Sequence, residues 1–262
     1  MSSKYIAKLL QIVFLVSFIS MGSLYAQNTF QPKPLDEQQK GFIYNKERTV
    51  DFKLHTSGYA LGLNFGTIPT YYKTKYYQFE IGELKHPKEI RSKSFYSSTF
   101  GQSAYSYGKR NNFIVLRAGI GGKRYFSEKA KEKGIVLGVN WELGPTLGLT
   151  KPYYIEINTI NIEDKEPYIK YSEANRDIFL NQDLIIGSAP FFKGFGEIGL
   201  IPGIHGKIAA HFSFGAFDDF VKAVEAGIML DVFTRKVPIL ANDLNKPYFL
   251  NLFITLQLGK RY

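Results

Sequence analysis

The sequence predicts an all-β fold, a transmembrane, antiparallel, up-and-down β-barrel of eight strands. Apolar and mixed side chains alternate with a period of two in the last fifteen residues, Tyr248–Tyr262, which is typical of a strand with two different surroundings. The same alternation recurs in seven earlier segments, close to the ~9–11 residues with which a tilted strand crosses a bilayer. Phenylalanine and tyrosine are abundant, with 22 and 18 residues, as in the aromatic girdles of membrane barrels.

The N-terminal residues have the pattern of a secretory signal peptide. Lys4 and Lys8 precede an apolar run from Leu9 to about Ile19, and small residues follow up to Ala26. We therefore expect a cleaved signal at 1–26, a periplasmic segment at 27–48 and the barrel at 49–262. An uncleaved N-terminal anchor is the alternative, which Gln11 and the short apolar run disfavour.

The amino-acid composition excludes several kinds of catalytic and metal-binding chemistry and indicates the partners. The chain has no cysteine, which excludes a lipid-anchored N-terminus, a disulfide framework, thiol catalysis and cysteine metal sites. The net charge is +10, or +8 without the signal, which carries two lysines and no acids. A basic exported protein meets anionic lipopolysaccharide rather than nucleic acid, so we expect outer-membrane lipid and lipopolysaccharide among the partners. We expect no cofactor.

The first three strands are predicted at residues 49–56, 59–67 and 75–84, where apolar residues occupy every second position. Ser57-Gly58 is a tight hairpin signal between the first two. In the fourth strand, 112–121, both faces carry apolar residues. An arginine at the lipid midplane costs ~2–4 kcal/mol, so Arg117 is expected to point inward.

The remaining strands are predicted at 135–149, 203–214, 221–234 and 248–262. With both ends of the barrel in the periplasm, the long connections face outward, including the outer loops 85–110 and 150–196. Within the second loop, residues 153–162 and 168–171 could form a projecting hairpin and residues 172–180 a short helix. If such a hairpin joined the barrel, the count would be ten strands.

The inward face of the predicted barrel carries a network of charged and histidine side chains. A turn centred near Asp218 would pair His211 with Glu225 and His205 with Asp231. An eight-stranded barrel is just wide enough for side chains to fill it, so we interpret the network as a salt-bridged plug. The alternative is a proton-sensitive or cation-binding lumen. The predicted members are Asp51, Lys53, His55, Glu80, Arg117, Glu142, His205, Lys207, His211, Glu225 and Asp231.

One combination of residues could carry catalysis. His211, Ser213 and Glu225 have the composition and spacing seen in outer-membrane lipid A 3-O-deacylases, in which serine attacks an ester. The predicted inward orientation argues against it, because lipid A is reached from the outer surface. We therefore expect no enzymatic activity, and the histidines show no zinc spacing, so we expect no metal site.

The first long loop is rich in basic residues. They could bind surface phosphates, and the alternative is an ordinary solvated loop. The residues concerned are His86, Lys88, Arg91, Lys93 and Arg110.

The chain ends on an aromatic residue, Tyr262, in phase with the apolar face that contains Leu256 and Leu258. This ending resembles the C-terminal strand of bacterial outer-membrane barrels, whose terminal aromatic is read by the barrel-assembly machinery. The resemblance implies that this strand is an assembly signal and that the assembly machinery is a partner.

Four short runs together resemble an outer-membrane β-barrel family of Bacteroidota, of the small OmpA/OmpX-like eight-stranded type. They are Leu84–Glu89, Tyr107–Phe113, Lys151–Tyr154 and Leu258–Tyr262. The resemblance implies an integral outer-membrane location and brings no catalytic residues. Because some barrels of that phylum belong to larger envelope machines, we expect a scaffold or accessory subunit of a complex for barrel assembly or protein export. The alternatives are a narrow channel and a lipid A-modifying hydrolase.

Overall fold

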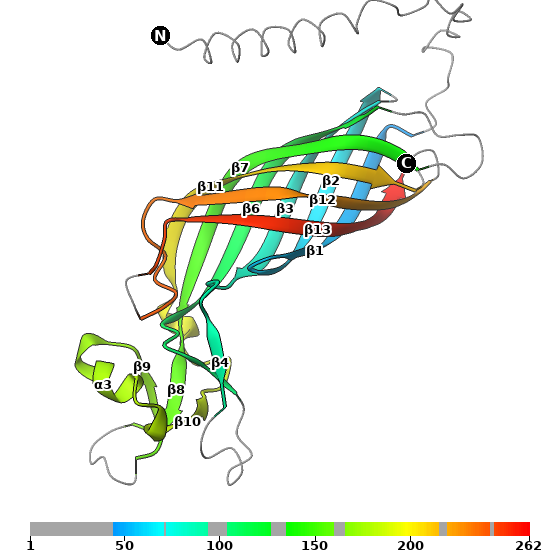
Figure 1. Ribbon diagram of the computed structural model, residues 1–262. Helices are drawn as coiled ribbons and strands as arrows, with labels where there is room; N and C mark the ends of the chain where they lie inside the picture. Colours follow the sequence, from blue (N-terminus) through cyan, green and yellow to red (C-terminus); the bar gives the residue numbers. More distant parts are fainter. Residues whose placement is uncertain are drawn as a thin grey trace, which may run out of the picture. The chain divides into compact units, whose positions relative to one another are not determined.

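Eight long antiparallel strands close into a barrel in the computed structural model of the chain (Figure 1). The structure describes residues 44–70, 72–93, 104–126, 135–159, 166–214, 219–241 and 244–262. Each barrel strand pairs with the next along the chain, and the first pairs with the last, so the predicted eight-stranded up-and-down barrel is confirmed. The strands are β1 (Lys46–His55), β2 (Gly58–Thr70), β3 (Lys73–Leu84), β6 (Asn111–Tyr125), β7 (Val136–Pro152), β11 (Gly199–Ser213), β12 (Phe220–Phe233) and β13 (Tyr248–Arg261).

Alternating side chains give the barrel an apolar outside and a largely polar inside. On β13, Leu250, Leu252 and Ile254 face outward and are more than 60% exposed, whereas Asn251 and Thr255 are buried in the interior. A contiguous apolar surface of this size is unstable in water and is what a barrel presents to lipid. The outer surface is therefore that of a membrane-spanning barrel. In the described part of the chain, no helix is long and apolar enough to cross a membrane.

The connections differ in length between the two ends of the barrel. The chain passes from β2 to β3, from β6 to β7 and from β11 to β12 through short connections, at the end that also holds Tyr262. At the other end, β3 to β6, β7 to β11 and β12 to β13 are joined by long segments, as predicted. The first turn there is short because Gly58 has a positive φ of 151° and approaches the Glu83 carbonyl too closely for a side chain.

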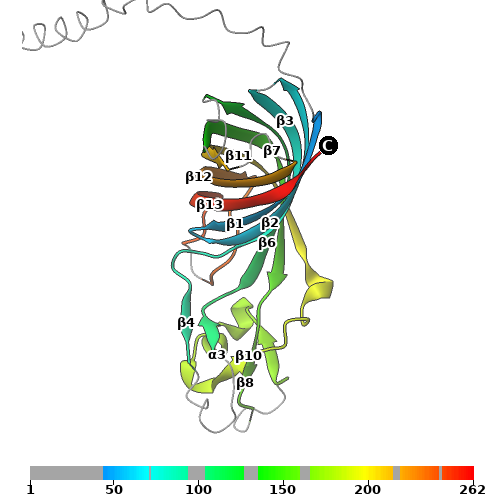
Figure 2. The same cartoon turned by 90° about the vertical axis from the view of Figure 1, so that its right-hand side faces the viewer.

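The long connections after β3 and β7 fold together beyond the barrel (Figure 2). We call the described residues of 86–110 and 153–198 the outer subdomain. Its elements are β4 (Ile90–Ser92), β5 (Tyr105–Tyr107), β8 (Tyr154–Ile157), β9 (Tyr168–Lys170), η1 (Glu173–Asn175), α3 (Arg176–Phe179), η2 (Gln182–Leu184), β10 (Ile185–Ser188) and η3 (Phe195–Glu197).

The alternative of ten barrel strands is wrong. The predicted hairpin does form between β8 and β9, but β10 adds to it, and the three strands make a separate sheet. A separate apolar core holds this sheet, the short helix α3 and β5 together. Its buried residues are Tyr105, Ile155, Ile157, Ile169, Tyr171, Phe179 and Ile185.

The segment between β12 and β13 closes the outer mouth of the barrel. Its residues Val237, Ile239 and Leu240 pack on a cluster of inward-facing apolar residues at the outer ends of the strands. The Asn111 amide donates to the Pro238 carbonyl over 2.6 Å, and the Arg110 N–H donates to the Ile239 carbonyl over 2.7 Å. The strand residues of this cap are Leu84, Phe113, Val115, Ile201, Phe233 and Phe249.

Some boundaries differ from those predicted. The first barrel strand begins at Lys46 rather than 49, so residues 46–48 belong to the barrel and not to the predicted periplasmic segment. The second outer loop begins after Pro152 rather than at 150, because β7 runs on as a strand. The predicted signal peptide, 1–26, and the rest of the predicted periplasmic segment up to residue 43 lie outside the described residues.

Candidate functional site

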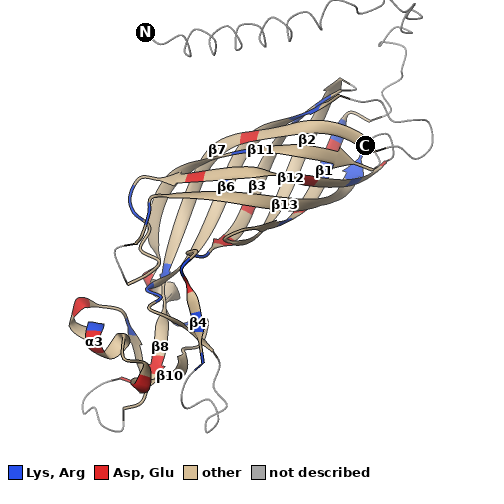
Figure 3. Cartoon of the chain, in the orientation of Figure 1, with Lys and Arg blue, Asp and Glu red and all other residues tan. Residues whose placement is uncertain are grey.

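The structure places all eleven predicted lumen residues inside the barrel wall, each 9% exposed or less. The hairpin of β11 and β12 pairs His211 with Glu225 and His205 with Asp231, in the register that the sequence predicts. Some ionic contacts join strand partners, as in Glu80–Arg117, Glu142–Lys207 and Glu225–His211. Arg117 also reaches across the lumen to Asp231 on β12, which is not a neighbour of β6. The acidic and basic positions along the strands can be followed in Figure 3.

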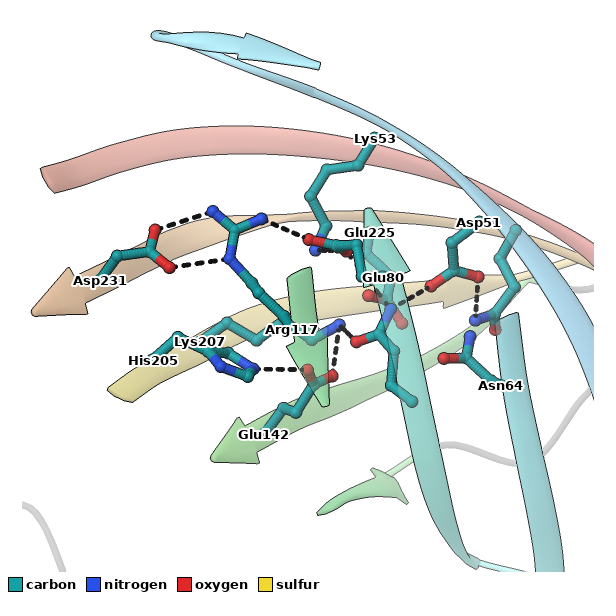
Figure 4. Close-up of polar contacts among 12 residues, drawn as sticks. Asp51, Lys53, Asn64, Glu80, Arg117, Glu142, His205, Lys207, Glu225 and Asp231 are labelled. Carbon is teal, nitrogen blue, oxygen red and sulfur yellow. Dashed lines mark hydrogen bonds and ion pairs between the residues drawn. The ribbon is translucent and has the colours of Figure 1, made fainter. Parts of the chain in front are cut away.

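Arg117 is the centre of one group of contacts. Its Nε and Nη2 donate to the two carboxylate oxygens of Asp231, over 2.7 and 2.9 Å, and its Nη1 donates to Glu80 over 2.6 Å (Figure 4). Lys53 pairs with the second oxygen of Glu80. All four side chains are at most 1% exposed, so these charges are stable only because each has a partner. His55 lies inside the barrel, with neither ring nitrogen hydrogen-bonded to a described residue.

Glu142 is the centre of a second group. It accepts from the Lys207 ammonium over 2.8 Å and lies 3.0 Å from Nε2 of His205. The other ring nitrogen of His205 lies 2.9 Å from the Thr146 hydroxyl. The Tyr76 hydroxyl lies within hydrogen-bond distance of Glu142. The glycine cluster at 119–122 makes room for these groups, because a Cβ at Gly119 or Gly121 would collide with Glu142 or Tyr76.

Asp51 is held by amides rather than by a cation. The side-chain amides of Gln78 and Gln257 donate to its two oxygens over 3.2 and 2.8 Å, and Lys207 donates to the carbonyl oxygen of Gln78. These amides link the Lys207 group to a third group near the end of the barrel that holds Tyr262. The described part of the lumen is thus crossed by hydrogen bonds from strand to strand.

Several members of this network were missing from the sequence prediction. Lys123 and Arg261 both pair with Glu47, over 2.8 and 2.9 Å, inside the barrel. Glu47 had been assigned to the periplasmic segment and Lys123 to a turn. Extending the predicted first strand back by two residues and the fourth forward by two would have found Glu47 and Lys123, because they share the parity of Asp51 and Arg117. Arg261 lay within the predicted last strand and shares the parity of Gln257.

The residues with deacylase-like composition lie inside the barrel, near the end that holds Tyr262. Nδ1 of His211 is 2.8 Å from Glu225, and its Nε2 is 3.4 Å from the Tyr125 hydroxyl. The Ser213 hydroxyl has no hydrogen bond to a described residue, and its side chain is fully enclosed. Among the described residues, Ser213 therefore has no hydrogen-bonded general base, and the barrel wall separates it from lipid esters outside. The geometry gives no support to hydrolysis.

The five predicted surface-phosphate residues are not gathered at one place. His86 and Lys88 line a groove beside Leu244, whereas Arg91 lines a different cavity. The Arg110 guanidinium lies 5.3 Å from the ring centre of Tyr171, and Lys93 is exposed at the end of the described part of the first loop. In the described residues, no group of three or more acids and histidines is arranged to hold a metal ion.

His86 joins the first outer loop to the segment before β13. Its Nδ1 accepts the Lys88 backbone N–H over 3.1 Å, which leaves Nε2 to donate to the Leu244 carbonyl over 3.3 Å. Burial lowers the pKa of His86, and the charges of Lys88 and Lys246 lower it further against the raising effect of the Leu244 carbonyl. Neutral histidine is therefore the form that the folded loop selects.

We expect this loop contact to weaken as the pH falls below the ordinary histidine pKa of about 6.5. Since the folded pKa is the lower one, the unfolded loop binds the proton more readily, and the contribution is complete only above that pH. After correction for the intrinsic pH dependence of amide exchange, hydrogen-exchange protection of residues 85–89 should be weaker at about pH 5.5 than at about pH 7.5. The His86→Gln variant should lose this pH dependence. Unchanged dependence in the variant would contradict the assignment.

The predicted assembly residues lie on the outward face of β13. Leu256 and Tyr262 are each 46% exposed, and Leu258 is half-buried. The backbone of Tyr262 bonds to Asn45 and Lys46, and the Arg48 guanidinium lies 5.1 Å from its ring centre. The final residue is therefore fixed at the seam where β13 meets β1. Its reading by an assembly machine stays a prediction.

Comparison with known proteins gives likenesses of architecture only. No protein-family model and no curated protein matches the chain. Neisserial surface protein A is 7% identical, with a TM-score of 0.43, and the match covers 84% of this chain and 97% of that one. The N-terminal β-barrel domain of OprF from Pseudomonas aeruginosa is 11% identical, with a TM-score of 0.33, over 84% and 98% of the two chains. No residue role or ligand is transferred from either.

Proposed function

We propose that this chain is a non-enzymatic, integral outer-membrane β-barrel that acts through its outer loops. In this proposal it is a scaffold or accessory subunit of an envelope complex for barrel assembly or protein export. The observation that carries the proposal is the outer subdomain, an ordered body with its own apolar core, on a barrel whose interior is occupied by side chains. Such a molecule has its accessible chemistry outside the membrane, on the loops.

The outer-membrane location is supported by the barrel and by its two ends. A closed barrel leaves no unpaired strand edge, which is the condition for strands to cross a bilayer. The short connections and Tyr262 lie at one end and the long connections at the other, which is the usual asymmetry between the periplasmic and outer ends.

The filled interior favours a binding role over transport. The outer mouth is covered by the apolar cap of Val237, Ile239 and Leu240. Below it, Arg117 on β6 pairs with Asp231 on β12 and Lys207 on β11 donates to Gln78 on β3, and both contacts cross the lumen between strands that are not neighbours. Eight-stranded barrels are narrow enough for their side chains to fill them. An ion would have to displace both layers, so we do not favour the channel.

The test is co-purification of a protein partner. The tagged chain would be extracted from envelopes in mild detergent and the bound proteins identified. The control replaces residues 151–198 by Asn-Gly, a turn that fits because Thr150 and Gly199 are paired strand residues. We expect a stoichiometric partner with the full chain, lost in the shortened chain although the shortened barrel still shifts on a denaturing gel when boiled. A full chain that is recovered alone would contradict the proposal.

A further inference from the structure

A cavity of about 430 Å³ lies against the outside of the barrel wall, under the outer subdomain. Tyr59, Glu83, Asn112 and Lys151 line its base. By the alternation of their strands, these four belong to the outward face that Leu61, Ile81, Ile114 and Leu149 continue toward the membrane. The cavity therefore lies at the outer lip, next to the lipid-facing surface and outside the lumen.

The cavity has more cations than carboxylates. Glu83 pairs with Lys85 at 3.5 Å and Glu89 with Lys109 at 2.9 Å, which accounts for both acids of the lining. Three further cations line it: Arg91, Lys151 and Lys193. The charge that remains is positive, and it is suited to an anionic group.

Lys151 is the most informative of these cations. Its side chain leaves β7 on the lipid-facing side, yet it is only 3% exposed. It donates to the Phe191 carbonyl, and its ammonium lies 4.1 and 4.7 Å from the ring centres of Phe191 and Phe195. Among the described residues, no carboxylate lies within ion-pair distance of it. A buried cation without a counter-charge is costly unless a ligand supplies the charge.

The aromatic residues that cover Lys151 are themselves exposed. Phe191, Phe192 and Phe195 are 62%, 81% and 42% exposed, and their ring centres lie 5.5–6.0 Å apart. The chain passes from them directly into β11, where Leu200 faces lipid. Exposed apolar rings at the end of a barrel are stable in the headgroup region of a bilayer. This phenylalanine cluster therefore marks the level at which the outer end of the barrel meets the lipid headgroups.

An apolar depression of about 900 Å³ lies on the same wall of the barrel, lined mostly by outward residues of β1, β2, β3, β6, β7 and β11. The inward positions Gly62, Glu80, Arg117, Thr146 and Gly203 also contribute to its lining. Small residues, Ala118, Pro145 and Pro202, make the wall hollow there. The depression and the cationic cavity share β2, β3, β6 and β7. A molecule with an anionic head and apolar chains fits both at once.

We propose that the cavity binds the phosphate of an outer-leaflet glycolipid of the lipid A type, with an acyl chain in the depression below. Lys151 and Lys193 hold the phosphate, and Arg91 closes over it. Lys193, whose ammonium lies 4.4 Å from the ring centre of Tyr168, is fixed at the cavity's edge. The inference rests on the outer-membrane location proposed above and is independent of a protein partner.

The experiment is a titration of the purified, folded full chain with bisphosphorylated lipid A, followed by native mass spectrometry. The variants are Lys151→Gln and Lys193→Gln, and the matched control is Lys75→Gln, an exposed lysine on the outward face of β3 at the opposite end. Each cavity variant should bind lipid A about tenfold more weakly or worse, as expected for the loss of one charged hydrogen bond. The control should bind like the wild type.

Lys193→Gln keeps the test valid if the buried Lys151 variant fails to fold. Dephosphorylated lipid A and phosphatidylcholine should bind more weakly than bisphosphorylated lipid A. Equal binding of these lipids, wild-type affinity in both cavity variants, or displacement by inorganic phosphate alone would overturn the proposal. A Lys193→Gln chain that loses its protein partner and keeps its lipid would also overturn it. Loss of lipid with retention of the partner would support it and leave the proposed function intact.

Discussion

The Arg117→Met variant is expected to lose about 3–5 kcal/mol of the free energy of unfolding, the usual effect of removing one partner from a buried ion pair. Arg117 bonds to both oxygens of Asp231 and to one oxygen of Glu80. Lys53 remains to balance Glu80 in the variant, but Asp231, which is completely buried, loses its cation. The destabilisation comes from that stranded carboxylate more than from the lost attraction.

Urea titration in detergent micelles, read by the gel shift between folded and unfolded barrel and by the fluorescence of Trp141, would measure the loss. Trp141 is the chain's single tryptophan and is half exposed on the lipid-facing side, so it reports folding without touching the network. The matched control is Arg124→Met, an exposed position on the same strand, for which we expect a change within about 0.5 kcal/mol.

A second variant separates the ion pair from simple packing. In the double variant Arg117→Met and Asp231→Asn, the buried carboxylate is replaced by a neutral group of the same shape. The double variant should therefore be more stable than Arg117→Met alone, although it carries two changes. If the single and double variants were equally unstable, the destabilisation would come from the lost packing of the arginine side chain and not from the unpaired Asp231 carboxylate.

The orientation of Arg117 could be predicted from the sequence, whereas its partner could not. A period of two divides the residues of a strand between two faces. The cost of a charge in lipid then decides that the face with Arg117 is the inward one. A turn assumed near residue 218 gave the register between two neighbouring strands, and the pairing of His211 with Glu225 predicted from it is confirmed. Asp231, however, lies on β12, and β12 is not a neighbour of β6. Contacts across a lumen depend on the tilt and curvature of the whole barrel, which no local pattern contains.

For Lys151, the sequence predicts the face of the strand correctly but not the burial of the side chain. Its parity puts it on the outward face, and there an isolated lysine at the end of a strand is expected to be solvated. It is buried because residues from Pro190 to Phe195, forty positions later, fold back over it. Among the short strands of the outer subdomain, β8 and β9 fall within the predicted hairpin. The strands β4, β5 and β10 were not predicted, because three or four residues are too few to show a period.

The Phe179→Ala variant is expected to unfold the outer subdomain locally while the barrel stays intact. Phe179 is 1% exposed and packs edge-on against Tyr171, with ring centres 5.6 Å apart, in a core that contains no barrel-strand residue. Removal of a buried phenylalanine ring costs about 3–5 kcal/mol, because the cavity left behind adds to the lost burial. A core of only seven buried residues contributes little free energy of folding, so this loss should exceed the stability of the subdomain alone.

Limited proteolysis and hydrogen exchange would detect this as cleavage and fast exchange within 166–188, with the barrel's gel shift unchanged. The matched control is Phe192→Ala, in which the ring removed is 81% exposed and the expected change is within about 0.5 kcal/mol. If Phe179→Ala also destabilised the barrel, the two parts would fold as one unit. Local unfolding alone would mean that the barrel serves as an anchor, so that a partner bound through the outer subdomain should be lost with it. The Arg117 network would then stabilise the barrel as the anchor, and the core around Phe179 would stabilise the binding surface. The two parts of the chain would unfold independently.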